Sequence, residues 1–215
     1  MSGLLPEPRD PNTAHCTIIA VDIAGFGLRD PSNDNQVRMR EGMYKAMHAA
    51  FDAAGIPWSS CRDEDRGDGM LVLAAAEVRK RPFADHLPSA LAEELALHNR
   101  HHRPRERIRL RLALHSGEVN FDRHGVTGSS INHTYRLLDS DTVRLALGKS
   151  AAVLAIISSD WFFEDVIRRN ELSRPSAYRQ VDVVNKETRA RAWIRLVRPV
   201  AARRPQAPPR AGQTA

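Results

Sequence analysis

An aspartate ends a short apolar strand near the N-terminus and is followed by glycines. Residues 16–23, CTIIAVDI, form a β-rich apolar run, and Gly25 and Gly27 come directly after it. This pattern predicts a buried strand that breaks into a glycine-rich turn. Asp22 departs from the apolar pattern, and a carboxylate near low-dielectric surroundings needs a cation or several hydrogen-bond donors to remain ionised. The fold therefore has to place a strongly polar group at the end of a core strand.

A second aspartate lies in a glycine turn farther along the chain. Asp68 stands between Gly67 and Gly69, and the flanking segments, 58–62 and 70–75, have the composition of strands. We predict a β-hairpin with an acidic turn here. One aspartate in a turn is ordinary turn chemistry. Two carboxylates beside glycines, whose amides can approach phosphate groups, also suit Mg²⁺ or Mn²⁺ bound together with a nucleotide.

Apolar periodicity and turn residues predict the remaining elements. We expect helices at 36–54, 87–98, 129–138, 142–147 and 159–169, the last capped by Ser159 or Asp160, and strands at 107–119, 153–158, 178–184 and 189–197. The resulting order is strand, helix, hairpin, helix, strand, helix, strand, helix, hairpin. It predicts an α+β fold, with helices packed on one mostly antiparallel sheet.

The length and composition suit one globular domain. With 215 residues, 42% of them hydrophobic, the chain can bury a single core. We place the domain at 14–198, between a flexible extension at 1–13 and a disordered, proline-rich tail at 199–215. The opening stretch lacks the apolar segment of a signal peptide, and AAVLAII at 151–157 is too short to span a bilayer. We therefore expect a cytoplasmic protein with no membrane partner.

The positive charge raises the alternative of nucleic-acid binding. The chain has a net charge of +6, and residues 98–111 contain six arginines. This segment has no aromatic residue that could stack on a base. Its second half alternates Arg107, Arg109 and Arg111 with apolar residues, which predicts a half-buried strand with one charged face. Nucleic-acid binding is the weaker alternative, because a positive face also attracts a small anion such as a nucleotide.

A polar pair lies on one of the predicted helices. Asn132 and Arg136 are four residues apart and share a face, while Ile131, Tyr135 and Leu138 turn towards the core. A solvated helix face would explain the pair. In-line phosphoryl transfer offers a second explanation, because an arginine and an asparagine can stabilise the charge that develops around an α-phosphate.

Four segments, in this order and spacing, resemble the class III adenylyl and guanylyl cyclases. They are DIAGF at 22–26, GDG at 67–69, HSGEV at 115–119 and the pattern G-x-x-x-N-x-x-x-R at 128–136. The resemblance covers the chain from about residue 14 to residue 197. It implies a ferredoxin-like βαββαβ-type domain with a C-terminal hairpin. It also implies an enzyme that converts a nucleoside triphosphate into its 3′,5′-cyclic monophosphate and releases pyrophosphate.

The resemblance implies roles for individual residues. Two divalent metal ions, Mg²⁺ or Mn²⁺, would be bound by Asp22, Ile23 and Asp68. Asn132 would orient the ribose, and Arg136 would stabilise the transition state. An obligate homodimer is implied, in which one subunit supplies both aspartates to a site and the other supplies Asn132 and Arg136. Nucleotide binding would involve Gly25, Phe26, Gly27, Glu64, Gly125 and Lys186, the last as the triphosphate ligand.

Two positions that select the base in this family are occupied by Glu64 and Gly125. Adenylyl cyclases use lysine and aspartate there, so the resemblance disfavours ATP and leaves GTP, UTP and CTP open. Glu64 fits the guanylyl pattern, but it is also part of an acidic run at 63–65, and Gly125 offers no side chain to guanine. A short cyclase domain with an unusual base site is similar to members that make cyclic pyrimidine nucleotides in bacterial antiphage defence. A separate receptor or effector protein would then respond to the product.

A catalytically inactive protein with the cyclase fold is the alternative to an enzyme. Such a regulator would bind a nucleotide or a partner without turnover. The presence of both aspartates together with Asn132 and Arg136 favours the enzyme. An inactive site has no physical need for two carboxylates.

Overall fold

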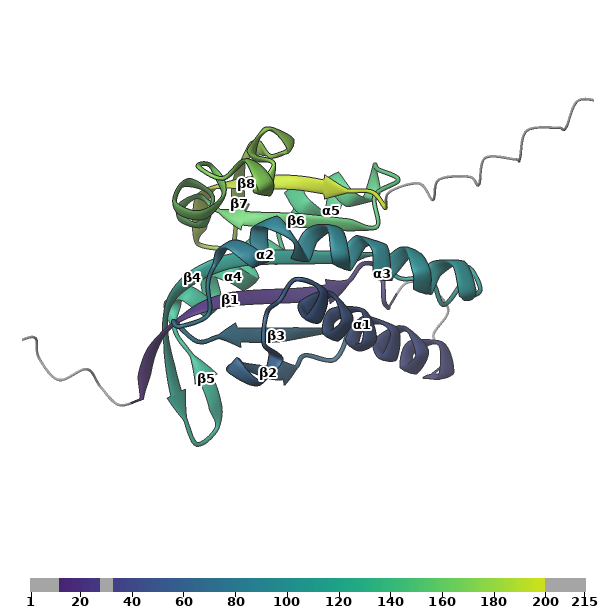
Figure 1. The fold of residues 1–215 in the computed structure, drawn as a ribbon, viewed down its shortest axis with the longest axis horizontal. Coiled ribbons are helices and arrows are strands. Elements are labelled where there is room, and N and C mark those ends of the chain that lie inside the picture. The colour runs from purple at the N-terminus through teal and green to yellow at the C-terminus, as the bar shows by residue number, and fades with distance from the viewer. Residues whose placement is uncertain (1–11, 28–32, 200–215) are drawn as a thin grey trace, which may run out of the picture.

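The computed structural model describes residues 12–27 and 33–199, which form one sheet with helices on both of its faces (Figure 1). The strands are β1 (Thr13–Ile23), β2 (Cys61–Asp65), β3 (Gly69–Ala74), β4 (Leu110–Asp122), β5 (Gly125–Thr127), β6 (Leu154–Ser159), β7 (Arg179–Asn185) and β8 (Thr188–Val197). The helices are α1 (Asn33–Ala53), α2 (Arg81–Asp85), α3 (Leu87–His101), α4 (Ser129–Leu138), α5 (Asp141–Gly148) and α6 (Asp160–Phe162). The predicted extension at 1–13 and the predicted tail at 199–215 lie outside the described residues, except for residues 12, 13 and 199. β1 already begins at Thr13.

The strand order is β2-β3-β1-β4-β6-β8-β7, and β5 pairs with β4. β1 lies between β3 and β4 and is antiparallel to both. Among the described strands, only β4 and β6 run parallel to each other. The first four strands with α1 and α3 follow the βαββαβ order, and β7 and β8 form the C-terminal hairpin. The predicted α+β fold is therefore confirmed.

Two helical layers cover the sheet. Helices α1 and α3 run in front of it in Figure 1, and α4 and α5 lie behind it. Two hydrophobic cores lie on the two faces of the sheet: the front core under α1 and α3, and the back core under α4 and α5. Side chains alternate between the faces of a strand, so β1 contributes to both. Val21 and Ile23 belong to the front core, and Ile18 and Ala20 belong to the back core. By the same alternation, Asp22 is on the side of the back layer.

The first strand of the predicted hairpin begins later than expected. Trp58–Ser60 is a 3-10 turn, and β2 starts at Cys61. The Trp58 ring packs on two rings of α1, with centroid distances of 3.9 Å to His48 and 4.8 Å to Phe51. These contacts hold the segment against α1 instead of along β3.

The prediction of an exposed charged face on the arginine-rich strand is wrong. β4 begins at Leu110, so Arg107 and Arg109 precede it, and Arg111 is only 8% exposed. The alternating pattern correctly separates two faces of the strand. It does not reveal that the back layer covers the face that carries Arg111.

The helix predicted at 159–169 changes its type after one turn. Ser159 caps it as predicted, because its hydroxyl accepts a hydrogen bond from the Phe162 amide. The chain then continues as a π-helix, Phe163–Ile167, and the Phe163 ring stacks on Trp193 of β8 at 3.8 Å between centroids. Four further elements are too short to show a periodic pattern and were not predicted: α2, β5 and the 3-10 turns Glu171–Ser173 and Pro175–Ala177.

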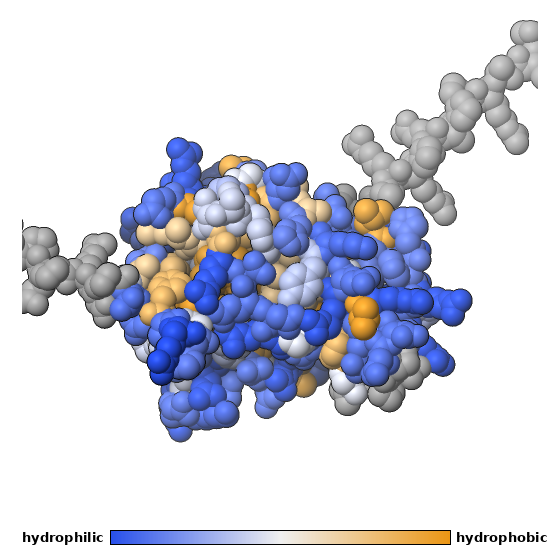
Figure 2. Space-filling view, turned by 90° about the horizontal axis from the view of Figure 1, so that it is seen from below, coloured by the Kyte–Doolittle hydropathy of each residue, from blue (hydrophilic) through white to orange (hydrophobic). Residues whose placement is uncertain are grey.

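The surface seen in Figure 2 is mostly hydrophilic, with smaller groups of hydrophobic side chains among the polar ones. Among the described residues, the large apolar side chains with the greatest exposure, Val184, Leu145 and Leu172, come from different elements. In the described part of the chain, no helix is both long enough and apolar enough to cross a bilayer.

Gly69 lies opposite Asp22 in the β1–β3 ladder and has no room for a side chain. A Cβ there would overlap the Val21 carbonyl oxygen, a backbone atom that cannot turn away. We expect Gly69→Ala to lower the free energy of unfolding, measured by urea denaturation, by about 3 kcal/mol. Gly148→Ala is the matched control, because a Cβ there meets open space, and it should change stability by less than about 1 kcal/mol. Equal stability of the two variants would contradict this account of the packing.

Candidate active site

The Asp22 side chain is paired with an arginine of the neighbouring strand. Asp22 and Arg111 are register partners in β1 and β4, and each residue is 8% exposed. Arg111 donates two hydrogen bonds, from Nε to Oδ1 at 2.7 Å and from Nη2 to Oδ2 at 2.6 Å. A carboxylate has about four acceptor positions. The pairing therefore uses about half of the capacity of Asp22 and leaves positions that could bind a metal ion.

Burial raises the pKa of the Asp22 carboxyl to about 6. The charge and hydrogen bonds of Arg111 oppose this effect, whereas the carboxylates of Asp68 and Asp139 add to it. At neutral pH the carboxylate is thus ionised but destabilised by its surroundings. A cation bound between Asp22 and Asp68 would relieve that destabilisation.

Asp68 lies at the tip of the β2–β3 hairpin, beside the end of β1. Its carbonyl oxygen accepts a hydrogen bond from the Ile23 amide at 2.9 Å, and its side chain is exposed. The carbonyl of Ile23, a predicted metal ligand, accepts a 3.3 Å hydrogen bond from the Phe26 amide. The donor set fits Mg²⁺ or Mn²⁺, which bind through one or two carboxylates and take further oxygens from phosphates and water.

A pocket of about 530 Å³ opens beside Asp68. The turn after β1 forms one wall, with Gly25 in a left-handed conformation at φ 72°. Within the described residues, the amides of Gly25 and Gly27 donate no hydrogen bond to backbone or side chain. Such amides make an anion-binding concavity. The rest of the lining includes Arg109, Arg111, Arg144 and the end of α5, so the pocket suits a phosphate chain.

The predicted catalytic pair lies outside this pocket, on α4. Asn132 is exposed, and the Arg136 side chain is 24% exposed and donates a 2.8 Å hydrogen bond to Glu187. The buried Nε of Arg136 has no hydrogen-bond partner among the described residues. Neither Asn132 nor Arg136 lines the pocket beside Asp68. One chain therefore does not bring the predicted metal ligands and the predicted catalytic pair into one pocket.

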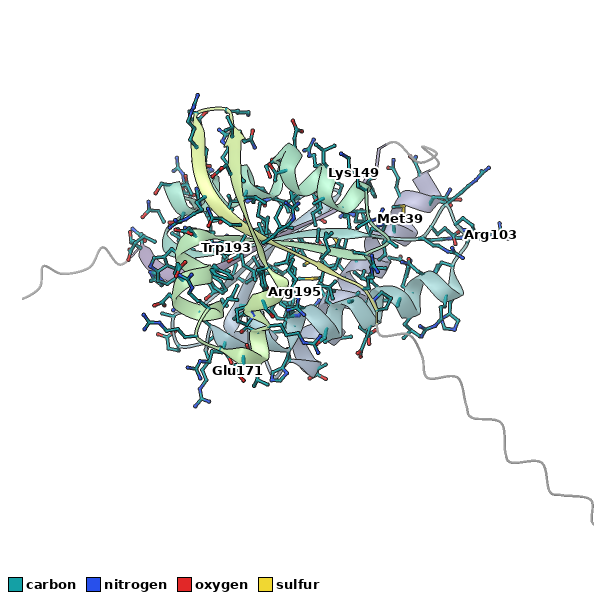
Figure 3. All side chains as sticks on the ribbon, turned by 90° about the horizontal axis from the view of Figure 1, so that it is seen from above. Met39, Arg103, Lys149, Glu171, Trp193 and Arg195 are labelled. Carbon is teal, nitrogen blue, oxygen red and sulfur yellow. The ribbon has the colours of Figure 1, made fainter. Side chains whose placement is uncertain are left out.

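Lys186 lies in the turn of the β7–β8 hairpin, where it has a φ of 52°. The turn is tied to α4, because Asn185 donates a 2.9 Å hydrogen bond to the Arg136 carbonyl. Figure 3 shows the free end of this hairpin projecting from the body, whereas Trp193 and Arg195, farther along β8, lie within the body. The structure thus places the predicted triphosphate lysine with the catalytic pair, and not with the aspartates.

The two predicted base-selecting positions are neighbours. A Cβ on Gly125 would lie 3.5 Å from Oε1 of Glu64. The Glu64 carboxylate accepts hydrogen bonds from Arg62 at 3.0 Å and from Arg66 at 2.7 Å. A base at this place would therefore meet a carboxylate that is already paired with two guanidinium groups.

Tyr135 does not turn wholly into the core as predicted. It is partly exposed, and the Arg66 guanidinium lies 5.8 Å from the centre of its ring. Its hydroxyl is buried without a hydrogen-bond partner among the described residues, and burial raises its pKa to about 12. The β2–β3 hairpin lies beside this part of α4, which explains why the ring ends at an edge of the core.

The sequence analysis did not predict that three arginines lie at the candidate site: Arg66, Arg111 and Arg144. The pairing of Arg111 with Asp22 could have been predicted from the preference for opposite charges on neighbouring strands, but only if the β1–β4 register were known. Arg109 is also directed inwards, since it donates to the carbonyls of Leu147, Ser150 and Ala152 at 2.5 to 2.8 Å. The arginine run is therefore no continuous basic face for a nucleic acid.

No protein-family model matches the sequence, and a search of curated proteins finds no match. Solved structures do share the fold. The guanylyl cyclase Cya2 is 18% identical with a TM-score of 0.58, and the match covers 89% of this chain and 95% of that one. The adenylate/guanylate cyclase/hydrolase from Silicibacter pomeroyi is 21% identical, with a TM-score of 0.57 and coverage of 86% and 98%.

A third similar structure is the guanylate cyclase domain of RhGC from Catenaria anguillulae, described in complex with GTP. It is 17% identical, with a TM-score of 0.54 and coverage of 85% of this chain and 97% of that one. At such identities the likeness establishes the fold alone. The chain has the fold of nucleotidyl cyclase domains.

We expect the Asp22 carboxyl to titrate near pH 6, and two substitutions to shift it in opposite directions. Arg111→Gln should raise the pKa, because it removes a neighbouring positive charge, and Asp68→Asn should lower it, because it removes a negative one. Carboxyl ¹³C NMR of the metal-free protein measures both shifts. If both variants shift the pKa in the same direction, this account of the site is wrong.

The raised pKa of Asp22 also makes stability depend on pH. The folded value of about 6 lies above the unfolded value of about 3.9, so the folded protein holds this proton more tightly. The associated stabilisation is complete below the unfolded pKa and is lost as the pH rises through the folded pKa.

Proposed function

We propose that this chain is a nucleotidyl cyclase. The 3′-hydroxyl of a nucleoside triphosphate attacks its own α-phosphate, the bond to the bridging oxygen breaks, pyrophosphate leaves and the hydroxyl proton is lost. The observation that carries the proposal is the electrostatic coupling of two carboxylates, Asp22 and Asp68, beside a pocket that Asp68 lines together with a glycine turn and three arginines. The shared fold with solved cyclase domains supports it.

Asp22 and Asp68 would hold two divalent ions, Mg²⁺ or Mn²⁺, with Ile23 nearby as a further oxygen donor. When bound, such ions lower the pKa of the attacking hydroxyl and neutralise phosphate charge. The described residues contain no group of three or more His, Cys, Asp and Glu that could hold a metal ion alone. The remaining ligands would therefore come from the nucleotide and from water, which couples metal binding to substrate binding.

We further propose that the working unit is a homodimer with two shared sites. The pocket at Asp68 lacks Asn132 and Arg136, and the buried Nε of Arg136 lacks a partner within the described chain. A second subunit related by a two-fold axis can supply Asn132 to the ribose and Arg136 to the charge on the α-phosphate, and its Lys186 lies beside them. Both sites of such a dimer are equivalent.

For the base, we propose that ATP is not the preferred substrate. Position 64 carries an acid, and position 125 carries a glycine with φ 140°, so neither offers the pattern expected for adenine. Two arginines hold the Glu64 carboxylate, and donors of this kind suit the carbonyl oxygens of GTP, UTP or CTP. A role of the product in antiphage signalling through a separate receptor stays a prediction of the resemblance.

One observation favours a second candidate function. Arg111 occupies both oxygens of Asp22, and an aspartate held in this way has fewer positions for a metal ion. The second candidate is a nucleotide-binding regulator without turnover. The two candidates differ in whether a cyclic product forms.

The decisive experiment incubates the purified protein with each of the four nucleoside triphosphates and Mg²⁺ or Mn²⁺, and detects the cyclic product by mass spectrometry. We expect product that requires the metal ion, with at least one other base preferred to ATP. Asp68→Ala should lower the rate more than about 100-fold, since residues that only support a metal ligand already contribute about 10- to 100-fold. Asp63→Ala, in the same hairpin, is the control and should keep the rate. No product with any base at high enzyme concentration would select the regulator.

Mixing two inactive variants tests the shared site. Asp22→Asn and Arg136→Ala each remove one half of every site in their own homodimer. In a mixed dimer one site collects both defects and the other is intact. With free subunit exchange about half of the dimers are mixed, so activity should recover to about a quarter of wild type. Recovery no greater than the sum of the separate variants, after exchange has been demonstrated, would show that each site is built within one subunit.

A further inference from the structure

Arg144 lies on the wall of the pocket that the proposed function assigns to the triphosphate. It is on α5, one turn before Gly148, and both residues line the pocket together with the glycine turn. Arg109 fixes this wall, because its guanidinium binds carbonyls at the end of α5 and in the segment that follows it. The backbone that carries Arg144 is therefore held in place, and its long side chain can extend towards a ligand.

The arginines of the pocket differ in how firmly they are held. Arg111 makes two short hydrogen bonds to Asp22 inside the protein, and Arg109 is held by three backbone carbonyls. Arg144 instead donates one hydrogen bond of 3.1 Å to Asp139, in an ion pair whose side chains are 49% and 50% exposed. Ion pairs this exposed contribute about 0 to 1 kcal/mol. Arg144 can therefore exchange Asp139 for a phosphate at little cost.

We propose that Arg144 binds the terminal phosphate of the nucleotide and makes the pocket select triphosphates over diphosphates. The inference rests on the proposed function of the pocket. A guanidinium can donate two parallel hydrogen bonds to phosphate oxygens, and Arg111 already donates two to Asp22. In the free protein Asp139 holds Arg144 near the pocket, and the phosphate replaces it on binding.

The test measures binding of inorganic tripolyphosphate and pyrophosphate to the full chain in the presence of Mg²⁺, by isothermal titration calorimetry. We expect Arg144→Ala to weaken tripolyphosphate binding about tenfold or more, with a smaller effect on pyrophosphate, and Arg144→Lys to fall between wild type and alanine. Arg168→Ala is the control, because Arg168 is exposed and paired with Glu164 away from the pocket. Tripolyphosphate binding unchanged in Arg144→Ala, or both anions weakened equally, would overturn the proposal.

Asp139→Asn separates a phosphate ligand from a purely structural ion pair. Removing Asp139 frees Arg144 and removes a negative charge near the pocket, so tripolyphosphate should bind as tightly as in wild type or more tightly. If the ion pair only stabilises the fold, Asp139→Asn and Arg144→Ala should weaken binding alike, and the proposal fails.

The mass-spectrometric assay keeps this test distinct from that of the cyclase. Cyclic product together with unchanged tripolyphosphate binding in Arg144→Ala would refute the role of Arg144 and leave the enzyme. Absence of product together with a selective loss of tripolyphosphate binding would refute the enzyme and leave Arg144 as a phosphate ligand.

Discussion

The ion pair between Asp22 and Arg111 joins the two central strands of the sheet, and the geometry of the candidate site depends on it. Removing water from two charges is costly, and a buried pair is stable only with short, well-aligned hydrogen bonds. The β1–β4 register supplies them by placing the two residues opposite each other. Loss of either partner leaves a charge buried alone, which costs about 3 to 5 kcal/mol. The same bonds fix the Asp22 carboxylate at the end of β1, where the glycine turn begins.

The sheet divides the polar groups of this chain between two places. The aspartates and the pocket lie at the ends of β1 and β3, whereas Arg136 and Lys186 lie where α4 meets the β7–β8 turn. The proposed cyclisation needs both sets within reach of one nucleotide. Arg136 does not line the pocket at Asp68, and a second copy of the chain related by a two-fold axis is the arrangement that we propose to complete the site.

Sequence patterns predicted most of this fold but only part of the candidate site. The bounds of α4 match the prediction because Gly128 precedes it and its apolar residues recur at helical spacing. The strand predicted at 58–62 begins only at Cys61. The Trp58 ring packs on His48 of α1, and a local sequence pattern does not show such a contact between distant residues. The burial of Arg111 was not predicted for a similar reason. Alternation along a strand shows that the strand has two faces, but it does not show which face a later helix covers. Asp22, Asp68, Asn132 and Arg136 remain predictions whose chemical roles require the experiments above.

The charges around Asp22 bear on the choice between an enzyme and an inactive regulator. Asp68 and Asp139 both raise the pKa of an aspartate that burial already disfavours, so the protein without a ligand holds three carboxylates near one another. Asp22 pairs with Arg111 and Asp139 pairs with Arg144. Asp68 is exposed at a turn and belongs to neither hydrophobic core. A buried carboxyl whose pKa is raised, as that of Asp22 is, is typical of sites that bind a cation or transfer a proton. A regulator that binds a nucleotide through arginines and backbone amides does not need such a carboxyl. The arrangement therefore supports the proposed metal-dependent enzyme over the proposed regulator.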